Sequence, residues 1–219
     1  MELIKYLNEH FITKSELLEC SKITEQELEQ FQHEDLVPKA SYKLKLKLVS
    51  DSFFGSHNEN QELEYYCKGY ISWLATVKSL ESNEAVYLNF VERYKAAINS
   101  LKGKGYASAD YKVNGGIDLH IEEEWSHFLN GIYGLCTKSG LPEDIAAKEL
   151  AILIINEIIE APTLDEKQRK RLESAVNLLD SVSALFAPHE RLKSSRHRLV
   201  DEIRRKYQLK PKELNSKLV

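Results

Sequence analysis

Residues 145–159, IAAKELAILIINEII, decide the architecture of this chain. Apolar side chains recur on every side of the helix that this stretch predicts, and a helix that is apolar all round is covered by its neighbours. Pro142 can open the helix, because proline at the first helical position gives up an N–H that would be unpaired there anyway. Glu143 and Asp144 suit the positive end of the helix dipole. We therefore expect a central helix inside a bundle.

Amphipathic patterns on both sides predict the helices that surround this central one. Thr163 and Glu166 have the spacing of a capping box, which would open the helix that follows it. Together the patterns predict a bundle of about six helices over residues 57–209, with a frayed tail at 210–219. The expected helices, besides the central one, are about 60–80, 83–101, 117–138, 163–186 and 188–207.

Residues 1–56 predict a smaller unit that begins with a short helix at 2–10. Thr13 can cap a second short helix, and Thr24 with Glu27 forms a capping box for a third, which Pro38 ends. A strand follows. This order resembles the small winged helix-turn-helix domains of the MerR and excisionase type. The expected fold is thus mostly α, with a winged-helix-like N-terminal unit that carries a short β-strand or wing.

The expected strand, SYKLKLKLVS at 41–50, alternates leucine with lysine, which is the period of two of a half-buried strand. Lys43, Lys45 and Lys47 could lie along a phosphate backbone, or they could form the solvated face of the strand and protect its edge from unwanted pairing. We favour the second interpretation. The expected recognition helix at 25–34 is rich in glutamate and has no lysine or arginine, so it would be repelled by DNA.

Charge is distributed unevenly along the chain. The 219 residues have a net charge of −4, yet residues 188–219 contain ten Lys/Arg and four Asp/Glu, a net of +6, which leaves −10 for the rest. Arg191, Arg198 and Arg205 recur every seven residues and would share one helix face. Such a face suits an anionic partner or an acidic protein surface, or it neutralises the chain's own acidic helices.

The segment DLHIEEEWSHF places His120, Glu124 and His127 at spacings that stack along one side of a helix. Two imidazoles and a carboxylate can hold a divalent transition metal or act as acid and base. Ordinary surface histidines and glutamates produce the same pattern. We find no nucleophile motif and no phosphate-binding loop, and we expect no cofactor.

The remaining composition favours a cytoplasmic protein. Cys20, Cys67 and Cys136 are scattered and do not suggest a disulfide framework. The longest apolar run is too short for a membrane span, and the first residues lack the apolar core of a secretory signal. We therefore expect no membrane partner. The oligomeric state stays open.

Four segments carry a resemblance to a known family: PKASYKL, SFFG, HFLNGIYGLCTKSGLPEDIAAKEL and FAPHERLKSSRHRLV. They resemble a bacterial family of unknown function, domain of unknown function family 6058, which carries the label "natural product biosynthesis protein". The resemblance covers nearly the whole chain. It implies an association with secondary metabolism and supplies no catalytic residues.

These observations favour a non-enzymatic accessory or regulatory binding protein. One alternative is a DNA-binding transcriptional regulator that uses the lysine strand together with the arginine-rich C-terminal helix. Another is a metal- or acid–base-dependent enzyme centred on His120, Glu124 and His127.

Overall fold

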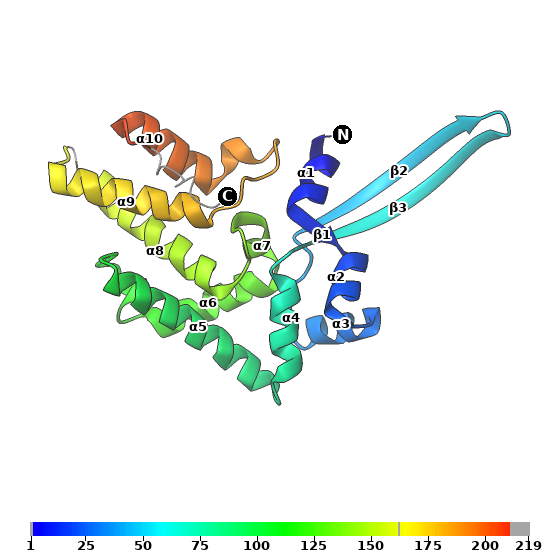
Figure 1. Cartoon of the computed structure of the whole chain (residues 1–219), viewed down its shortest axis with the longest axis horizontal. Helices are drawn as coiled ribbons and strands as arrows, with labels where there is room; N and C mark the ends of the chain where they lie inside the picture. Colours follow the sequence, from blue (N-terminus) through cyan, green and yellow to red (C-terminus); the bar gives the residue numbers. More distant parts are fainter. Residues whose placement is uncertain (1, 162, 211–219) are drawn as a thin grey trace, which may run out of the picture.

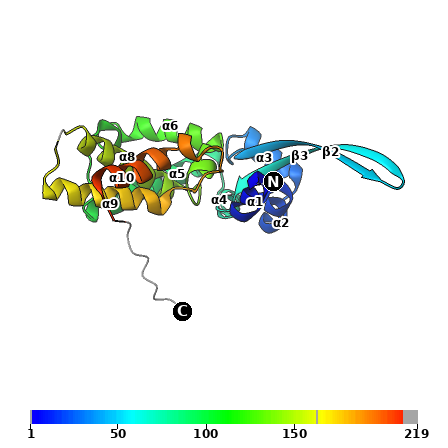
Figure 2. The ribbon, with the colours of Figure 1, turned by 90° about the horizontal axis from the view of Figure 1, so that it is seen from above.

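The computed structural model describes residues 2–161 and 163–210. The chain is mostly helical and contains a small three-stranded antiparallel sheet (Figure 1), which confirms the expected class at that level. A helical body lies at one end and a long two-stranded hairpin projects from the other (Figures 1 and 2). Within the described residues, no helix is long and apolar enough to cross a membrane.

The N-terminal part contains three short helices and the sheet. The helices α2 and α3 begin at capping boxes formed by Thr13 with Glu16 and by Thr24 with Glu27, and the threonine caps are those that the sequence predicts. The strand order is β1-β3-β2, so β2 lies at an edge of the sheet. The elements are α1 (Glu2–His10), β1 (Phe11–Thr13), α2 (Lys14–Ser21), α3 (Glu25–His33), β2 (Tyr42–Ser52) and β3 (Gly55–Cys67).

The prediction of a helix at about 60–80 is wrong for the first part of this range. Residues Gly55–Cys67 form strand β3, and the helix α4 covers only Tyr70–Ser79. Residues 55–65 of β3 each face a residue of β2, and Glu62 and Glu64 lie opposite two of the lysines. This pairing overrides the local helix preference of a segment rich in glutamate and glutamine. The expected boundary between residues 56 and 57 therefore falls inside the hairpin.

The body is built around α8, as the sequence predicts. This helix packs between α5 and α9 (Figure 1), and it buries side chains on all sides. The remaining elements of the body are α5 (Asn83–Gly103), η1 (Tyr111–Val113), α6 (Ile117–Leu129), α7 (Ile132–Cys136), α8 (Pro142–Ile159), α9 (Glu166–Val182), η2 (Arg191–Lys193), η3 (His197–Asp201) and α10 (Glu202–Tyr207).

Three helix boundaries differ from the predictions. The helix expected at 117–138 breaks into α6 and α7 at Gly131, whose φ of 77° lies in the left-handed region. Helix α9 begins at a capping box formed by Asp165 and Gln168, not by Thr163 and Glu166. No helix begins at Pro188: a 3₁₀ turn at 191–193 is separated by the extended Ser194 from the helical segment that ends in α10. The expected tail lies outside the described residues beyond residue 210.

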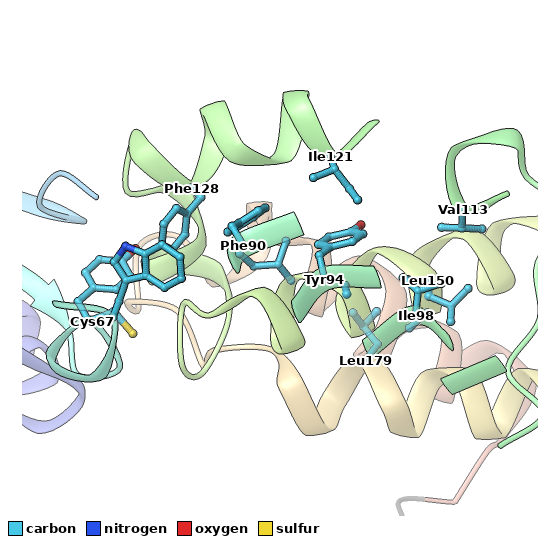
Figure 3. Packing of buried hydrophobic residues seen from close by; sticks show 14 of the residues in the cluster. Cys67, Phe90, Tyr94, Ile98, Val113, Ile121, Phe128, Leu150 and Leu179 are labelled. Atoms are coloured by element: carbon cyan, nitrogen blue, oxygen red, sulfur yellow. The ribbon is translucent and has the colours of Figure 1, made fainter. Parts of the chain in front are cut away.

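One continuous hydrophobic cluster joins the N-terminal part to the body. Figure 3 shows Phe90, Tyr94 and Ile98 in a row along α5, below Ile121 of α6. Trp73 of α4 is fully buried beside this row and packs edge-on against Phe90. Because both parts share this core, they hold a fixed relation to each other.

Backbone hydrogen bonds fix the seam between the two parts. The indole N–H of Trp73 donates to the Leu36 carbonyl at 2.8 Å, and the Lys39 N–H donates to the Leu129 carbonyl at 2.9 Å. The bond from Trp73 to Leu36 is buried, where an unpaired polar group would be costly. The segment after α3 is thereby held against the end of α6.

We predict that Gly131→Ala destabilises this seam. A Cβ at position 131 would lie 2.6 Å from the Lys39 carbonyl oxygen, and the left-handed backbone disfavours any L side chain. The free energy of unfolding, measured by urea denaturation, should fall by about 1–3 kcal/mol.

Gly103→Ala is the matched control, because nothing lies within 4 Å of a Cβ there and the residue ends α5. This variant should be neutral or gain up to about 1 kcal/mol. Equal stabilities for the two variants would contradict the account of the seam.

Candidate functional site

The hairpin β2–β3, residues 42–67, which we call the arm, is the most exposed element of the fold. It extends from the body as a two-stranded ribbon (Figures 1 and 2). Phe53 and Phe54 form its two-residue turn, and their side chains are 97% and 95% exposed. The two rings meet edge to face with centroids 5.4 Å apart. The tip of the arm thus exposes a pair of aromatic rings to solvent.

The base of the arm is fixed by a second hydrophobic cluster, which includes Tyr6, Phe11 and Tyr65. The rings of Phe11 and Tyr42 pack edge-on with centroids 5.1 Å apart. The Tyr42 hydroxyl donates to Glu190 at 2.6 Å, which ties the first residue of β2 to the segment that follows α9. The base of the arm is therefore held rigidly against the rest of the fold.

The two faces of the arm differ in chemistry. Even-numbered residues of β2 form an apolar stripe, Leu44, Leu46 and Leu48, of which only the part near the base packs against the second cluster. Odd-numbered residues carry the lysines on the opposite face. The stripe thus continues beyond the body toward the tip, where Leu48 is exposed.

The predicted lysine row is largely neutralised. Lys43 forms an ion pair with Glu64 at 2.6 Å and Lys45 with Glu62 at 3.3 Å, whereas Lys47 lies opposite Asn60. The arm as a whole contains three lysines and four acidic residues. A continuous positive surface along β2 is therefore absent from the arm.

The predicted arginine row is divided. Arg191 lies in η2 and its Nε donates to the Phe186 carbonyl at 3.1 Å, so it does not share a helix with Arg198 and Arg205. The latter two line a shallow depression with Glu202 between them. The helix α10, which carries Arg205, and the strand β2 lie in separate parts of the molecule (Figures 1 and 2). The lysine and arginine rows do not converge.

The helical body contains a buried polar cluster that brings the three predicted acid–base residues together. His120 and Glu124 of α6 are each 4% exposed, with 3.6 Å between Nε2 and Oε1. His127 is half exposed, and its Nδ1 lies 3.9 Å from the same Glu124 oxygen. Two residues that the sequence reasoning missed complete the cluster: Tyr133 donates a hydrogen bond to Glu124, and Glu149 lies 3.7 Å from His120 Nε2.

Burial controls the protonation of this cluster. Loss of solvation raises the pKa of Glu124 to about 7, although the hydrogen bond from Tyr133 opposes the rise. Burial also lowers the pKa of His120, against the opposing effect of the Glu149 carboxylate. Neither ring nitrogen of His120 has a hydrogen-bond partner within the described residues. The cluster favours a neutral carboxyl and a neutral imidazole in the core.

The cluster consists of ionisable side chains packed at the edge of the core. Across residues 2–161 and 163–210, no group of three or more His, Cys, Asp or Glu side chains is placed so that it could hold a metal ion. Four pockets in that part of the chain are lined by residues other than His120 and Glu124. The cluster itself can bind and release a proton.

Comparison with known proteins finds one family. The model of a family of unknown function (DUF6058) matches residues 86–208, which span the body from α5 to α10. The arm and the N-terminal helices lie outside this match. No curated protein and no solved structure is significantly similar to the chain.

We predict that Glu124→Gln removes a pH-dependent loss of stability. The folded pKa of Glu124 lies above its ordinary value, so the contribution of this carboxyl to the free energy of unfolding falls as pH rises from about 4.5 to about 7. The rise corresponds to at most about 3 kcal/mol. Gln cannot ionise and its amide oxygen can still accept from Tyr133, so the variant should exceed wild type above pH 7.

Urea denaturation across a pH series measures this difference. Glu122→Gln serves as the control, because its side chain is exposed on the same helix and makes no ion pair within the described residues. The control should follow wild type. A stability difference for Glu124→Gln that stays constant from pH 4 to pH 8 would show that Glu124 is not the titrating group.

Proposed function

We propose that this chain, which belongs to the family of unknown function DUF6058, is a non-enzymatic binding protein with an accessory or regulatory role. The observation that carries the proposal is the aromatic tip of the arm, where Phe53 and Phe54 stand in solvent while the base of the arm is held rigidly. Exposed apolar groups gathered on a projecting element are typical of protein–protein contact. Phenylalanine is also enriched in the cores of interfaces.

The charge of the arm favours a protein partner over a polyanion. A nucleic acid binds through lysines and arginines that neutralise phosphates, and their contribution grows with their number. On the arm, Lys43 and Lys45 already pair with glutamates, and acidic residues outnumber lysines by one. The apolar stripe and the two phenylalanines suit a groove or a strand of a protein instead.

The order of elements supports a second candidate, a winged-helix DNA reader. The order α1-β1-α2-α3-β2-β3 with sheet order β1-β3-β2 resembles that of a winged helix, in which α3 would be the recognition helix and the arm its wing. Helix α3 offers Glu25, Glu29 and Gln30 on its surface, and the nearby Lys14 pairs with Glu25 at 2.5 Å. Its contact chemistry therefore disfavours DNA, and we place it second.

The buried cluster does not support the enzymatic alternative. A general acid or base must lie within hydrogen-bond reach of its substrate. His120 and Glu124 are closed off by their own neighbours, and only His127 is half exposed. We interpret the cluster as part of the core.

Two further expectations belong to this proposal. The thiols of Cys20, Cys67 and Cys136 are all free in the described part, which suits a reducing cytoplasm. An association with bacterial secondary metabolism rests on the family resemblance alone.

We predict that the arm tip contacts a partner in cells of the native host. A photoreactive phenylalanine analogue at position 53 should give a discrete cross-linked product, because the side chain reaches into the interface. The same analogue at position 111 is the control, since Tyr111 is 70% exposed but lies on the body. Mass spectrometry of the products identifies what was joined.

Two outcomes of the cross-linking decide the proposal. A discrete product at position 53, together with none at 111, supports the arm as the binding surface. Equal, diffuse labelling at both positions would contradict it.

We also predict no mobility shift with duplex DNA at low salt, where any phosphate contacts of the lysines would be strongest. A random-sequence duplex pool tests this without knowledge of a target site. A shift that disappears as salt is raised and that is lost in Lys43→Glu/Lys47→Glu would reverse the order of the two candidates.

A further inference from the structure

The outer half of β2 is an uncovered sheet edge. Within residues 2–161 and 163–210 the strand pairs only with β3, so one of its sides has backbone N–H and C=O groups without strand partners there. Residues 47–52 are all exposed, and the arm stands away from the body there (Figure 2). An exposed edge of this length invites pairing with another strand unless it is blocked by charge or shape.

The charges along this edge are self-complementary. Among the described residues, Lys47 makes no ion pair, because Asn60 lies opposite. Asp51 makes no ion pair either, and it accepts a hydrogen bond from Ser56. The two side chains lie on the same face of one strand, four residues apart. Between them lies Val49, which is 60% exposed.

We propose that a second copy of this chain occupies the edge. The two β2 strands run antiparallel about a two-fold axis at Val49, so that each Lys47 faces Asp51 of the other copy. This contact is isologous, because the same residues meet in both directions. The proposal rests on the proposed function, since it names the partner that the arm binds, and it joins two arms into a four-stranded ribbon.

The same register explains the apolar residues. Phe54 of one copy lies level with Leu44 of the other, and Leu46 lies level with Ser52. The tip of each arm is then placed beside the apolar stripe near the base of its partner. Contact with that stripe would remove the two phenylalanines from water and offset the exposure that they have in a single chain.

Two other registers of the antiparallel pair place the charged side chains of β2 less favourably. An axis at Lys47 places the two Lys47 side chains directly opposite each other, which is repulsive. An axis at Leu48 places Lys47 opposite Val49, so Lys47 gains no charged partner. It places Asp51 opposite Lys45, which already forms an ion pair with Glu62 of its own chain. Of these three, only the axis at Val49 pairs the free lysine with the free aspartate.

Disulfide trapping tests the register directly. Directly opposed residues of antiparallel strands have Cα atoms about 4.5–5.5 Å apart, within the range that a disulfide spans. In a Cys20→Ser background, which removes the exposed native thiol, Val49→Cys should oxidise to a covalent dimer. Leu48→Cys should cross-link poorly, because the two residues 48 are diagonal at about 7–8 Å.

Charge exchange tests the contact without a cross-link. Light scattering on the purified full chain should give twice the mass of 25.2 kDa. Lys47→Asp should raise the dimer dissociation constant at least tenfold, and the double change Lys47→Asp/Asp51→Lys should restore it. These residues lie outside the core, so the variants should unfold like the wild type.

A single-chain mass at all concentrations, or preferential cross-linking of Leu48→Cys, overturns the proposal. Its failure can be told apart from that of the proposed function. The purified chain could be monomeric and still give a discrete cross-link in cells from position 53 to a different protein. That result would support the binding role of the arm and contradict its pairing with a second copy.

Discussion

The arm depends on the packing at its base. An isolated two-stranded hairpin is marginal in water, and here a long one has its outer half unsupported. Tyr42 and Tyr65 lie opposite each other in the first rungs, where the aromatic cluster of Phe11 and Tyr6 covers them. Because the ring packing and the hydrogen bond from Tyr42 to Glu190 hold those rungs, the remaining pairs can continue in register to the tip. Weakening the packing at the base would therefore destabilise the strand pairing along the whole arm.

The body and the arm have different chemical characters. The body pairs or buries several of its ionisable groups: Arg196 and Arg204 both bind Asp180, and Glu124 is held between His120 and Tyr133. The arm exposes two phenylalanine side chains almost fully and has an open strand edge. The family match covers the body, whereas the surface that we assign to binding lies outside it.

Sequence patterns predicted the local features and missed those that depend on distant contacts. The buried α8, the caps at Thr13 and Thr24 and the strand from Tyr42 followed from periodicity and capping chemistry. Strand β3 did not, because Leu63 and Tyr66 have a helical spacing that continues into α4, and the segment becomes a strand only when β2 lies beside it. The approach of Glu149 to His120 joins two helices and has no local signal. Phe53 and Phe54 did have one, an apolar pair before Gly55 within a polar segment.

Hydrogen exchange of the purified chain tests most directly the claim that the arm is a pairing surface. The account predicts that amides of β2 between residues 46 and 52 are protected at high protein concentration and exchange faster on dilution, while those of α8 stay protected throughout. Exchange of the β2 amides that is fast and independent of concentration would contradict it, since an unpaired edge strand would then be the state of the chain in solution.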